Sequence, residues 1–300
     1  MRVAGAVDIG GTRTKIGIVS DDARIVQRAT ISTTEAGDPL PLVDGIVATL
    51  QPLLAGAASG GATIAGVGVS VAGFLDRDRT AMVANANLRA LCNFPLRQTL
   101  EERLGMPCRL EVDSNAATIG EYRHGAGQGA RRLLGVTVGT GLGGGVIIDG
   151  ALLRYTGECA GDLGHIIVAP NGRQCTCGAR GCLEAMVCSA ALSQRANRRA
   201  VRDIVTAAQR GDKRARGAIT DTARWLGIGL ASLTPIFAPD RIVVGGGVSA
   251  AGNLLLRVVR KAYATHVAPE FRDAVEIVSS SLHGWEGMVG AASIVFQPMT

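Results

Sequence analysis

The sequence predicts an α/β protein made of two similar domains, and three observations support this fold class. The chain has 300 residues, which exceeds what one hydrophobic core comfortably organises. Apolar segments of strand type alternate with segments of helical periodicity, which is typical of mainly parallel sheets. The order strand, glycine turn, strand occurs after Val3 and again after Leu133, which indicates a weak internal duplication.

The elements follow from hydrophobic periodicity and from turn residues. In the first half we expect strands over residues 3–9, 14–19, 24–31, 64–71 and 108–112, and helices over 40–54, 95–104 and 114–122. In the second half we expect strands over residues 133–138, 146–148 and 241–244, a helical stretch over about 184–237, and helices over 254–263 and 284–296. The last helix is expected to return to the first domain.

Composition favours a packed soluble protein over a disordered one. Apolar residues make up 47% of the chain and charged residues 19%. The net charge is +6, but the basic residues are scattered and only 3% of residues are aromatic. A basic surface that suits an anionic substrate, or that has no role, is therefore favoured over nucleic-acid binding. The start MRVAGAVDIGG predicts a strand and not a signal peptide, and no membrane span is expected, so a cytoplasmic location is predicted.

The first candidate phosphate site is Asp8-Ile9-Gly10-Gly11-Thr12, between two strands. Glycine allows backbone N–H groups to face an anion without a Cβ in the way, and Thr12 adds a hydroxyl donor. Asp8, at the end of its strand, can hold a magnesium ion through water. An ordinary hairpin turn is the alternative interpretation.

Two further glycine segments occur in the second half. Gly139-Thr140-Gly141 opens a run that continues to Gly145 and repeats the device of the first site, so the two loops could grip the β- and γ-phosphates of a nucleotide. Gly245-Gly246-Gly247 follows a strand and could let an adenine or ribose pack flat against the backbone, or could simply be a tight connection. The spacing fits neither a P-loop nor a dinucleotide fingerprint.

Asp113 is the candidate catalytic base. It follows a strand, and ligands of open α/β sheets bind at the carboxyl ends of strands. A carboxylate there can accept a proton from a hydroxyl group as a phosphoryl group arrives. The alternative is that Asp113 caps the following helix, and both roles are compatible.

His165, Cys175, Cys177 and Cys182 have the composition and spacing of a tetrahedral zinc site. Gly178 and Gly181 would let a short loop wrap the ion. Four protein ligands leave no open position for a reacting water molecule, so this zinc is predicted to be structural. The other cysteines lack partners at ligand spacing.

Four stretches together resemble one family over essentially the full length of the chain. They are Asp8–Thr12, Asp113-Ser114-Asn115-Ala116-Ala117 with Gly120-Glu121, the run from Gly139 to Gly150, and Ala160-Gly161-Asp162-Leu163-Gly164-His165 with the cysteine loop through Leu183-Glu184. The chain resembles the ROK (repressor, open reading frame, kinase) sugar kinases. The resemblance implies a two-domain actin-like ATPase fold, of the ribonuclease H-like and hexokinase type, with a cleft between the domains.

The resemblance also implies the reaction and its partners. It implies ATP, Mg²⁺ and one structural Zn²⁺, transfer of the γ-phosphoryl group to the 6-hydroxyl of a hexose, and a homodimer. The domains would be a small one, residues 1–113 with 284–300, and a large one, residues 114–283, with the zinc loop at 165–184.

Residue roles carry over from the matching positions. Asp113 is similar to the general base of the family, and His165 is similar to a residue that binds both zinc and the anomeric end of the sugar. Glu184 and Asn87 are similar to residues that bind sugar hydroxyls, and the segment from Ser70 to Gly73 is similar to a backbone segment beside the sugar.

Three positions depart from the family pattern. Val112 replaces an Asn, Asp162 replaces the Glu of a sugar-contacting motif, and Leu91 replaces a common Trp. A lost polar partner costs about 1–3 kcal/mol. We therefore expect a modified hexose, such as the amino sugar kanosamine, in preference to plain glucose.

Other functions remain alternatives at this point. Within the kinases these are a glucokinase or an N-acetylhexosamine kinase. A sugar-responsive ROK repressor would need a DNA-binding domain ahead of Asp8, and the short preceding segment disfavours it. An actin-like filament or chaperone ATPase would need neither the Cys/His cluster nor Glu184.

Overall fold

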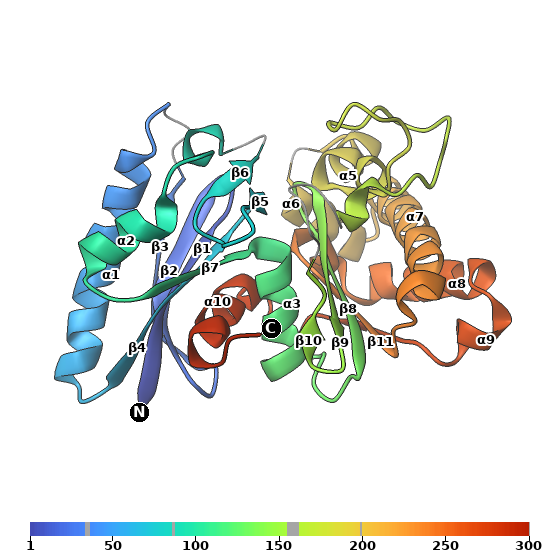
Figure 1. Cartoon of the computed structure of the whole chain (residues 1–300). Helices are drawn as coiled ribbons and strands as arrows, with labels where there is room; N and C mark the ends of the chain where they lie inside the picture. The colour runs from blue at the N-terminus through green and yellow to red at the C-terminus, as the bar shows by residue number, and fades with distance from the viewer. Residues whose placement is uncertain (34–36, 86–87, 155–161, 199, 300) are drawn as a thin grey trace. The chain divides into compact units, whose positions relative to one another are not determined.

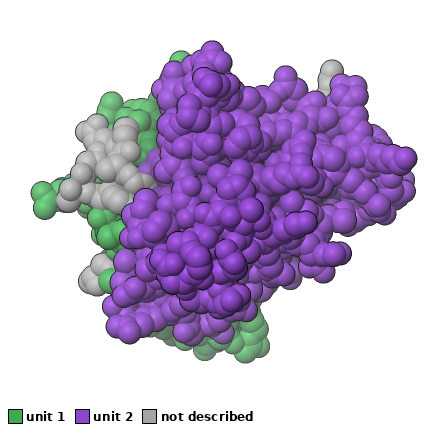
Figure 2. Space-filling model, turned by 90° about the vertical axis from the view of Figure 1, so that its right-hand side faces the viewer, with its two compact units in different colours: residues 1–125, 151–161, 285–300 green, residues 126–150, 162–284 purple. Residues whose placement is uncertain are grey.

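The chain forms two compact units, each with its own sheet. The computed structural model describes residues 1–33, 37–85, 88–154, 162–198 and 200–299 (Figure 1). Unit 1 contains Met1–Gly125, Ala151–Gly161 and Trp285–Thr300, and unit 2 contains Ala126–Gly150 and Asp162–Gly284 (Figure 2). The helix after Asp113 therefore belongs to unit 1, and the domain boundaries expected at residues 113 and 283 stay a prediction.

Unit 1 begins with a strand hairpin and ends with a helix from the C-terminal segment. Its elements are β1 (Arg2–Ile9), β2 (Arg13–Ser20), β3 (Ile25–Ser32), α1 (Leu40–Ser59), β4 (Thr63–Val71), β5 (Phe74–Leu75), β6 (Met82–Ala84), η1 (Arg89–Leu91), α2 (Leu96–Leu104), β7 (Cys108–Val112), α3 (Asp113–His124) and α10 (Glu286–Phe296). The return of the last helix to the first sheet agrees with the expectation from sequence.

Unit 2 repeats the sheet and adds a helical region. Its elements are β8 (Arg132–Val138), β9 (Leu142–Ile148), η2 (Leu163–His165), α4 (Leu183–Val187), α5 (Ser189–Ala196), α6 (Val201–Gln209), α7 (Lys213–Phe237), β11 (Arg241–Gly245), η3 (Gly247–Ala251), α8 (Asn253–His266), α9 (Pro269–Arg272) and β12 (Glu276–Ser279). The short strand β10 (Ala151–Leu152) follows β9 in the chain.

The two sheets have the same topology. The strand orders are β3-β2-β1-β4-β7 and β10-β9-β8-β11-β12. In each, an antiparallel hairpin, β1 with β2 or β8 with β9, is followed by two parallel partners. The duplication that the sequence suggested is present in the strand order.

Alternate residues of the unit 1 strands pack against different layers. Val3, Val7 and Ile9 join the core formed with α1 and α2, whereas Ala4 and Ala6 pack with Met288 and Ala292 of α10. This alternation is what a sheet covered on both faces requires, because successive side chains point to opposite faces. Figure 1 shows α1 and α2 on one side of this sheet and α10 and α3 on the other.

Helix α1 corrects one expectation. It is long and apolar enough to cross a membrane by length and composition, although no such segment was expected from the sequence. Its buried residues, among them Leu42, Ile46 and Leu50, belong to the core of unit 1. The helix is therefore accounted for by packing on the sheet.

Two boundaries differ from the sequence prediction for local reasons. Leu142–Gly145, expected in a glycine turn, pair with β8 and so belong to β9. The expected helical stretch 184–237 is divided into α4, α5, α6 and α7. Extended backbone at Cys188 ends α4, left-handed backbone at Asn197 ends α5, and Asp212 caps α7 by accepting a hydrogen bond from the Ala215 N–H group.

Glycines allow α10 to lie directly on its neighbours. A Cβ on Gly290 would lie 1.7 Å from the Ala116 carbonyl oxygen of α3, and a Cβ on Gly68 would lie 1.7 Å from the Ala291 carbonyl oxygen. Because real Cβ contacts never come this close, the helix would have to move away from both elements if either glycine were replaced.

We predict that Gly290→Ala destabilises the protein. Overpacking costs about 1–3 kcal/mol, and here the clash is with backbone, which cannot rotate away. The loss should exceed the gain of about 1 kcal/mol in helix propensity. Urea denaturation followed by circular dichroism measures it. Gly217→Ala is the matched control, since Gly217 is exposed in α7 with no atom near its Cβ position, and it should stabilise by about 0.5–1 kcal/mol. Equal stability of the two variants would contradict the prediction.

Candidate active site

A row of three polar side chains crosses the sheet of unit 1. Asp8 on β1 pairs in register with Ser70 on β4, and Ser70 pairs with Glu111 on β7. All three lie near the carboxyl ends of parallel strands, where ligands of open α/β sheets bind. Asp113 begins α3 at the same edge, two residues after Glu111.

Asp8 is held by residues from three elements. Its Oδ1 atom accepts a hydrogen bond from the Ser70 hydroxyl at 3.0 Å, and its Oδ2 atom lies 3.3 Å from Lys15 Nζ on β2. The first turn of α10 approaches so closely that a Cβ on Gly287 would lie 2.7 Å from Asp8 Oδ1. The carboxylate therefore faces the N-terminus of α10, whose backbone dipoles favour negative charge.

The first glycine turn follows Asp8. Gly10 N–H donates to the Arg13 carbonyl oxygen at 3.1 Å, which closes the turn between β1 and β2. The Thr12 carbonyl oxygen accepts from Thr33 N–H at 3.0 Å and ties the turn to the end of β3. The segment is thus both a hairpin turn and a fixed loop beside Asp8.

Asp113 is half-buried at the start of α3. Its Oδ1 atom accepts a hydrogen bond from Ser114 N–H at 2.7 Å. The N-cap residue of α3 is Val112, whose side chain makes no capping hydrogen bond. Asp113 therefore does not act as the N-cap residue, which was the alternative to a catalytic role, although its negative charge still suits the first turn of the helix.

The second and third glycine segments adjoin each other in unit 2. Gly139–Gly141 follow β8, and Gly245 at the end of β11 pairs with Thr137 of β8. Gly246 has a φ of 82°, and a Cβ on it would lie 2.5 Å from the Val138 carbonyl oxygen. A glycine is required here, and it places the two predicted nucleotide-binding segments side by side at one edge of the sheet.

Glu184 and Ser189 fix the second glycine loop. Glu184 Oε2 accepts a hydrogen bond from Leu142 N–H at 2.9 Å and lies 2.5 Å from the position that a Cβ on Gly141 would take. Ser189 donates from its hydroxyl and from its N–H to the Gly139 carbonyl oxygen, at 2.7 and 2.8 Å. Ser189 was not among the predicted site residues, because it lies inside the helical stretch expected over about 184–237 and becomes a helix start only where α5 begins.

His165, Cys175, Cys177 and Cys182 come together as predicted. Their ligand atoms all lie within 4.8 Å of one another. The Sγ atoms of Cys177 and Cys182 are 3.7 Å apart, and Cys175 Sγ is 3.6 Å from His165 Nδ1. A tetrahedral zinc with bonds of about 2.3 Å separates its sulfur ligands by about 3.8 Å, so the cluster fits this ion.

The loop that carries the thiols has the geometry that its glycines require. Gly178 and Gly181 have φ values of 93° and 79°, and a Cβ on Gly181 would lie 1.6 Å from the Ala169 carbonyl oxygen. Burial raises the pKa of the Cys182 thiol to about 12, whereas a hydrogen bond from the Ala179 backbone lowers the pKa of Cys177. A metal that binds here displaces protons from thiols.

Asp162 contacts the same cluster. Its Oδ2 atom lies 3.3 Å from His165 Nε2, and its Oδ1 atom accepts from Gly164 N–H at 3.2 Å. Burial raises the pKa of Asp162, and the nearby His165 opposes this shift. A carboxylate on the second nitrogen of a metal-binding histidine fixes the orientation of the ring. Glu184 also reaches this cluster, since its Oε1 atom lies 3.8 Å from Cys175 Sγ.

The remaining predicted positions have different surroundings. Gly73 has a φ of 114° in the turn before β5, while Leu91 is 2% exposed and belongs to the core of unit 1. Leu91 therefore contributes to packing. Asn87 lies outside the described residues, as do Ala160 and Gly161 of the sugar-contacting motif.

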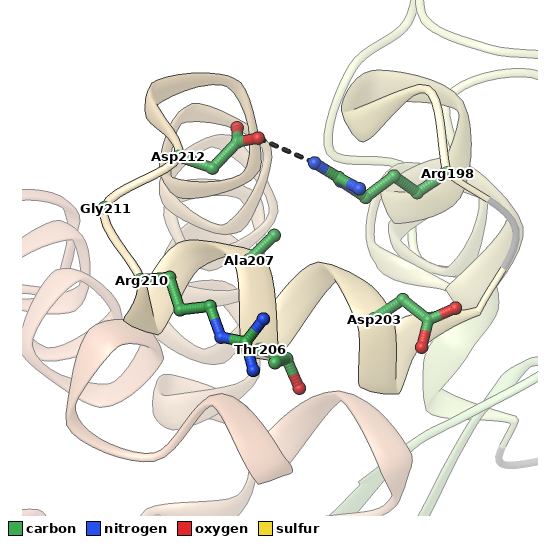
Figure 3. A pocket seen from close by; sticks show the side chains of 7 residues that line it. All are labelled: Arg198, Asp203, Thr206, Ala207, Arg210, Gly211 and Asp212. Carbon is green, nitrogen blue, oxygen red and sulfur yellow. Dashed lines mark hydrogen bonds and ion pairs between the residues drawn. The ribbon is translucent and has the colours of Figure 1, made fainter.

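A hollow of about 610 Å³ lies on unit 2 beside helix α6. Figure 3 shows that it is lined by side chains of α6 and of the segments on either side, including the ion pair between Arg198 and Asp212. None of the predicted site residues lines this hollow, so it is not the site that the sequence predicted.

Comparison with known proteins places the chain in a family. The ROK family model matches residues 4–297. The chain belongs to the ROK family. It is 34% identical over 315 residues to a glucokinase of Streptomyces coelicolor, with 97% of each chain covered. It is 33% identical over 262 residues to an N-acetylmannosamine kinase of Salmonella typhi, with 84% of this chain and 86% of the relative covered.

A solved ROK structure has the same fold. The crystal structure of a ROK family glucokinase from Streptomyces griseus in complex with glucose and AMPPNP matches with a TM-score of 0.87 and 35% identity, covering 98% of this chain and 99% of the other. The predictions of a ROK member, of the actin-like ATPase fold and of a sugar kinase are confirmed. The roles of individual residues stay predictions.

Proposed function

We propose that this ROK kinase transfers the γ-phosphoryl group of ATP to the 6-hydroxyl of a hexose, with Asp113 as general base. The observation that carries the proposal is the common sheet edge of Asp8, the first glycine turn and Asp113 in unit 1. A carboxylate and an anion-binding turn at one edge are what phosphoryl transfer to an alcohol needs.

Each unit contributes groups suited to one part of the reaction. In unit 1, Asp113 orients the sugar hydroxyl and accepts its proton, while the first glycine turn offers backbone N–H groups to phosphate oxygens. In unit 2, the glycines of the adjoining segments Gly139–Gly141 and Gly245–Gly247 offer backbone without a Cβ for the nucleotide.

The surroundings of Asp8 fit a magnesium ion bound through water. The Ser70 hydroxyl donates to one carboxylate oxygen of Asp8, and the Lys15 ammonium pairs with the other. Each oxygen keeps a lone pair that can accept a hydrogen bond from the water shell of Mg²⁺. When bound with ATP, the ion neutralises negative charge on the phosphate oxygens. Lys15 supplies positive charge at the same place.

We predict that Asp113→Asn lowers kcat by about 10²–10⁴-fold, because general base catalysis contributes that much. The amide keeps the size and the hydrogen bond with Ser114 but cannot accept the proton. ATP binding, measured by calorimetry, should stay unchanged. Asp21→Asn, at an exposed turn of unit 1, is the control and should keep wild-type kcat. Turnover within threefold of wild type in Asp113→Asn would refute the role of Asp113.

The proposed substrate is a hexose altered around C3 or C4, such as the amino sugar kanosamine. Val112 precedes Asp113 at the sheet edge and cannot hydrogen-bond a hydroxyl group, so a glucose hydroxyl there would lose a partner. Asp162 and Asp113 provide carboxylates that an ammonium group can pair with. Plain glucose and N-acetylmannosamine, the substrates named for the two relatives, are the alternatives.

A panel of sugars tests this part of the proposal. Coupled ADP release should give kanosamine a kcat/KM at least about tenfold above that of glucose, which corresponds to one polar partner of about 1.4 kcal/mol. Val112→Asn should raise kcat/KM for glucose and so reduce the difference in kcat/KM between kanosamine and glucose. A clear preference for glucose over every amino sugar would end the kanosamine proposal and leave the kinase reaction intact.

We propose that the Cys/His cluster binds a structural Zn²⁺. The support is that the distance between the sulfur atoms of Cys177 and Cys182 matches the one expected around a tetrahedral zinc. Four protein ligands complete the coordination, so the ion would hold the loop 165–184 and the position of Glu184 next to it. We also propose a cytoplasmic homodimer, in line with the family resemblance and with thiols that a reducing compartment preserves.

Metal analysis tests the zinc. We expect one zinc per chain by mass spectrometry of the purified protein. Cys177→Ser should lose the metal and lower the melting temperature, because its thiol is a ligand and it is exposed enough for the replacement to cause no packing defect. Cys188→Ser, which changes a cysteine outside the cluster, should keep both. Wild-type protein without zinc after expression in zinc-supplemented medium would exclude the metal.

A further inference from the structure

Glu111 is a buried charge for which the proposed reaction has no role. Its side chain is 2% exposed, on the face of the sheet that α3 and α10 cover. It lies in the polar row with Asp8 and Ser70, directly before Val112 and Asp113. A buried carboxylate is costly unless it is paired and hydrogen-bonded, so its partners show what the position does.

One carboxylate oxygen binds the start of α3. Glu111 Oε1 accepts a hydrogen bond from Asn115 Nδ2 at 3.1 Å and from Val112 N–H at 3.1 Å. These bonds surround Asp113 on both sides in the chain. They therefore fix the strand-to-helix junction from which the predicted base projects.

The other oxygen binds two arginines from distant segments. Glu111 Oε2 accepts from Arg154 Nη1 at 2.7 Å and lies 3.9 Å from Arg79 Nη1. Arg154 also donates from Nη2 to the Met299 carbonyl oxygen at 2.9 Å. Arg79 lies in the connection between β5 and β6, in left-handed backbone with a φ of 52°.

Both arginines come from segments next to the predicted sugar contacts. The β5–β6 hairpin begins directly after Gly73 and leads to Asn85, which donates to the Ala72 carbonyl oxygen at 2.8 Å. In the chain, Arg154 lies eight residues before Asp162, ahead of the motif that is predicted to contact the sugar. Glu111 thus joins the base-bearing junction to both segments.

We propose that Glu111 and Arg154 form a positioning pair that couples the predicted base to the segments that contact the sugar. This inference rests on the proposed kinase function and concerns its sugar side. Loss of the pair leaves Asp113 present but loosens its placement against the sugar hydroxyl. Such misplacement reduces rate without changing the chemical groups. Among the described residues, the bonds of the pair lead to α3, to Arg79 and to the Met299 carbonyl oxygen. We therefore expect its loss to affect the sugar kinetics more than the affinity for ATP.

The test is steady-state kinetics of Arg154→Met with the best sugar of the panel. We expect the sugar KM to rise at least about tenfold and kcat to fall, while the ATP KM stays within twofold of wild type. Glu111→Gln should behave similarly. The double variant Glu111→Gln with Arg154→Met should lose less activity than the two single losses combined. Each single change leaves one buried charge without its partner, whereas the double change removes both charges.

Arg123→Met is the matched control. Arg123 is also a half-buried arginine of unit 1, and it donates to the Ser293 carbonyl oxygen at 2.7 Å near the other end of α3. It should lower the melting temperature without changing the sugar KM. If Arg154→Met keeps the wild-type sugar KM, or raises the sugar and ATP KM values equally, the pair has only a structural role and the inference is wrong.

Two further measurements separate the possible failures. If Arg154→Met does not fold, Arg154→Lys replaces it, because lysine keeps the charge but cannot reproduce the bonds to both Glu111 and Met299. A wild-type sugar KM in that variant also overturns the inference. Wild-type enzyme that releases no ADP with any sugar contradicts the proposed function itself, whereas active wild type with unaffected variants contradicts only the positioning pair.

Discussion

Unit 1 depends on the close packing of α10 against β4 and α3. Gly68 and Gly290 remove the side chains that would otherwise separate these elements, and Gly287 brings the first turn of the helix against Asp8. The carboxylate that we assign to magnesium is therefore set by a helix from the far end of the chain. Because backbone packs directly against backbone, α10 has little freedom to shift against β4 and α3. In an interior packed this densely, a small displacement of α10 would also move Asp8.

The repeated topology explains why each unit offers a binding edge. In both sheets the hairpin strand and its parallel partner end at the same edge, and a glycine turn follows the hairpin strand. The residues at the two edges differ. Unit 1 has carboxylates at Asp8 and Asp113, whereas unit 2 has Gly246 and the Cys/His loop, which supports Glu184 beside the second glycine turn.

Features that depend on local sequence could be predicted, and features that depend on distant pairs could not. The glycine turns, the strands around them and the zinc ligands follow from spacing within short segments. The ion pair of Glu111 with Arg154 could not be found, because residues 43 apart in the chain meet only after folding. The division of residues 184–237 into four helices was missed, although Gly211 and Asp212 are an ordinary stop and start for helices.

Strand alternation separates the positioning pair from the position that we connect with substrate choice. Leu110 belongs to the core on the side of α1 and α2, and Glu111 faces the side of α3 and α10. The Val112 side chain therefore points to the same face of the sheet as Leu110 and to the opposite face from Glu111, since side chains alternate along a strand. Replacing Val112 with a polar residue can alter which sugar hydroxyl groups find a hydrogen-bond partner without disturbing the bonds of Glu111 to α3 and Arg154. Residues adjacent in the chain can thus change specificity and preserve the geometry of the base independently.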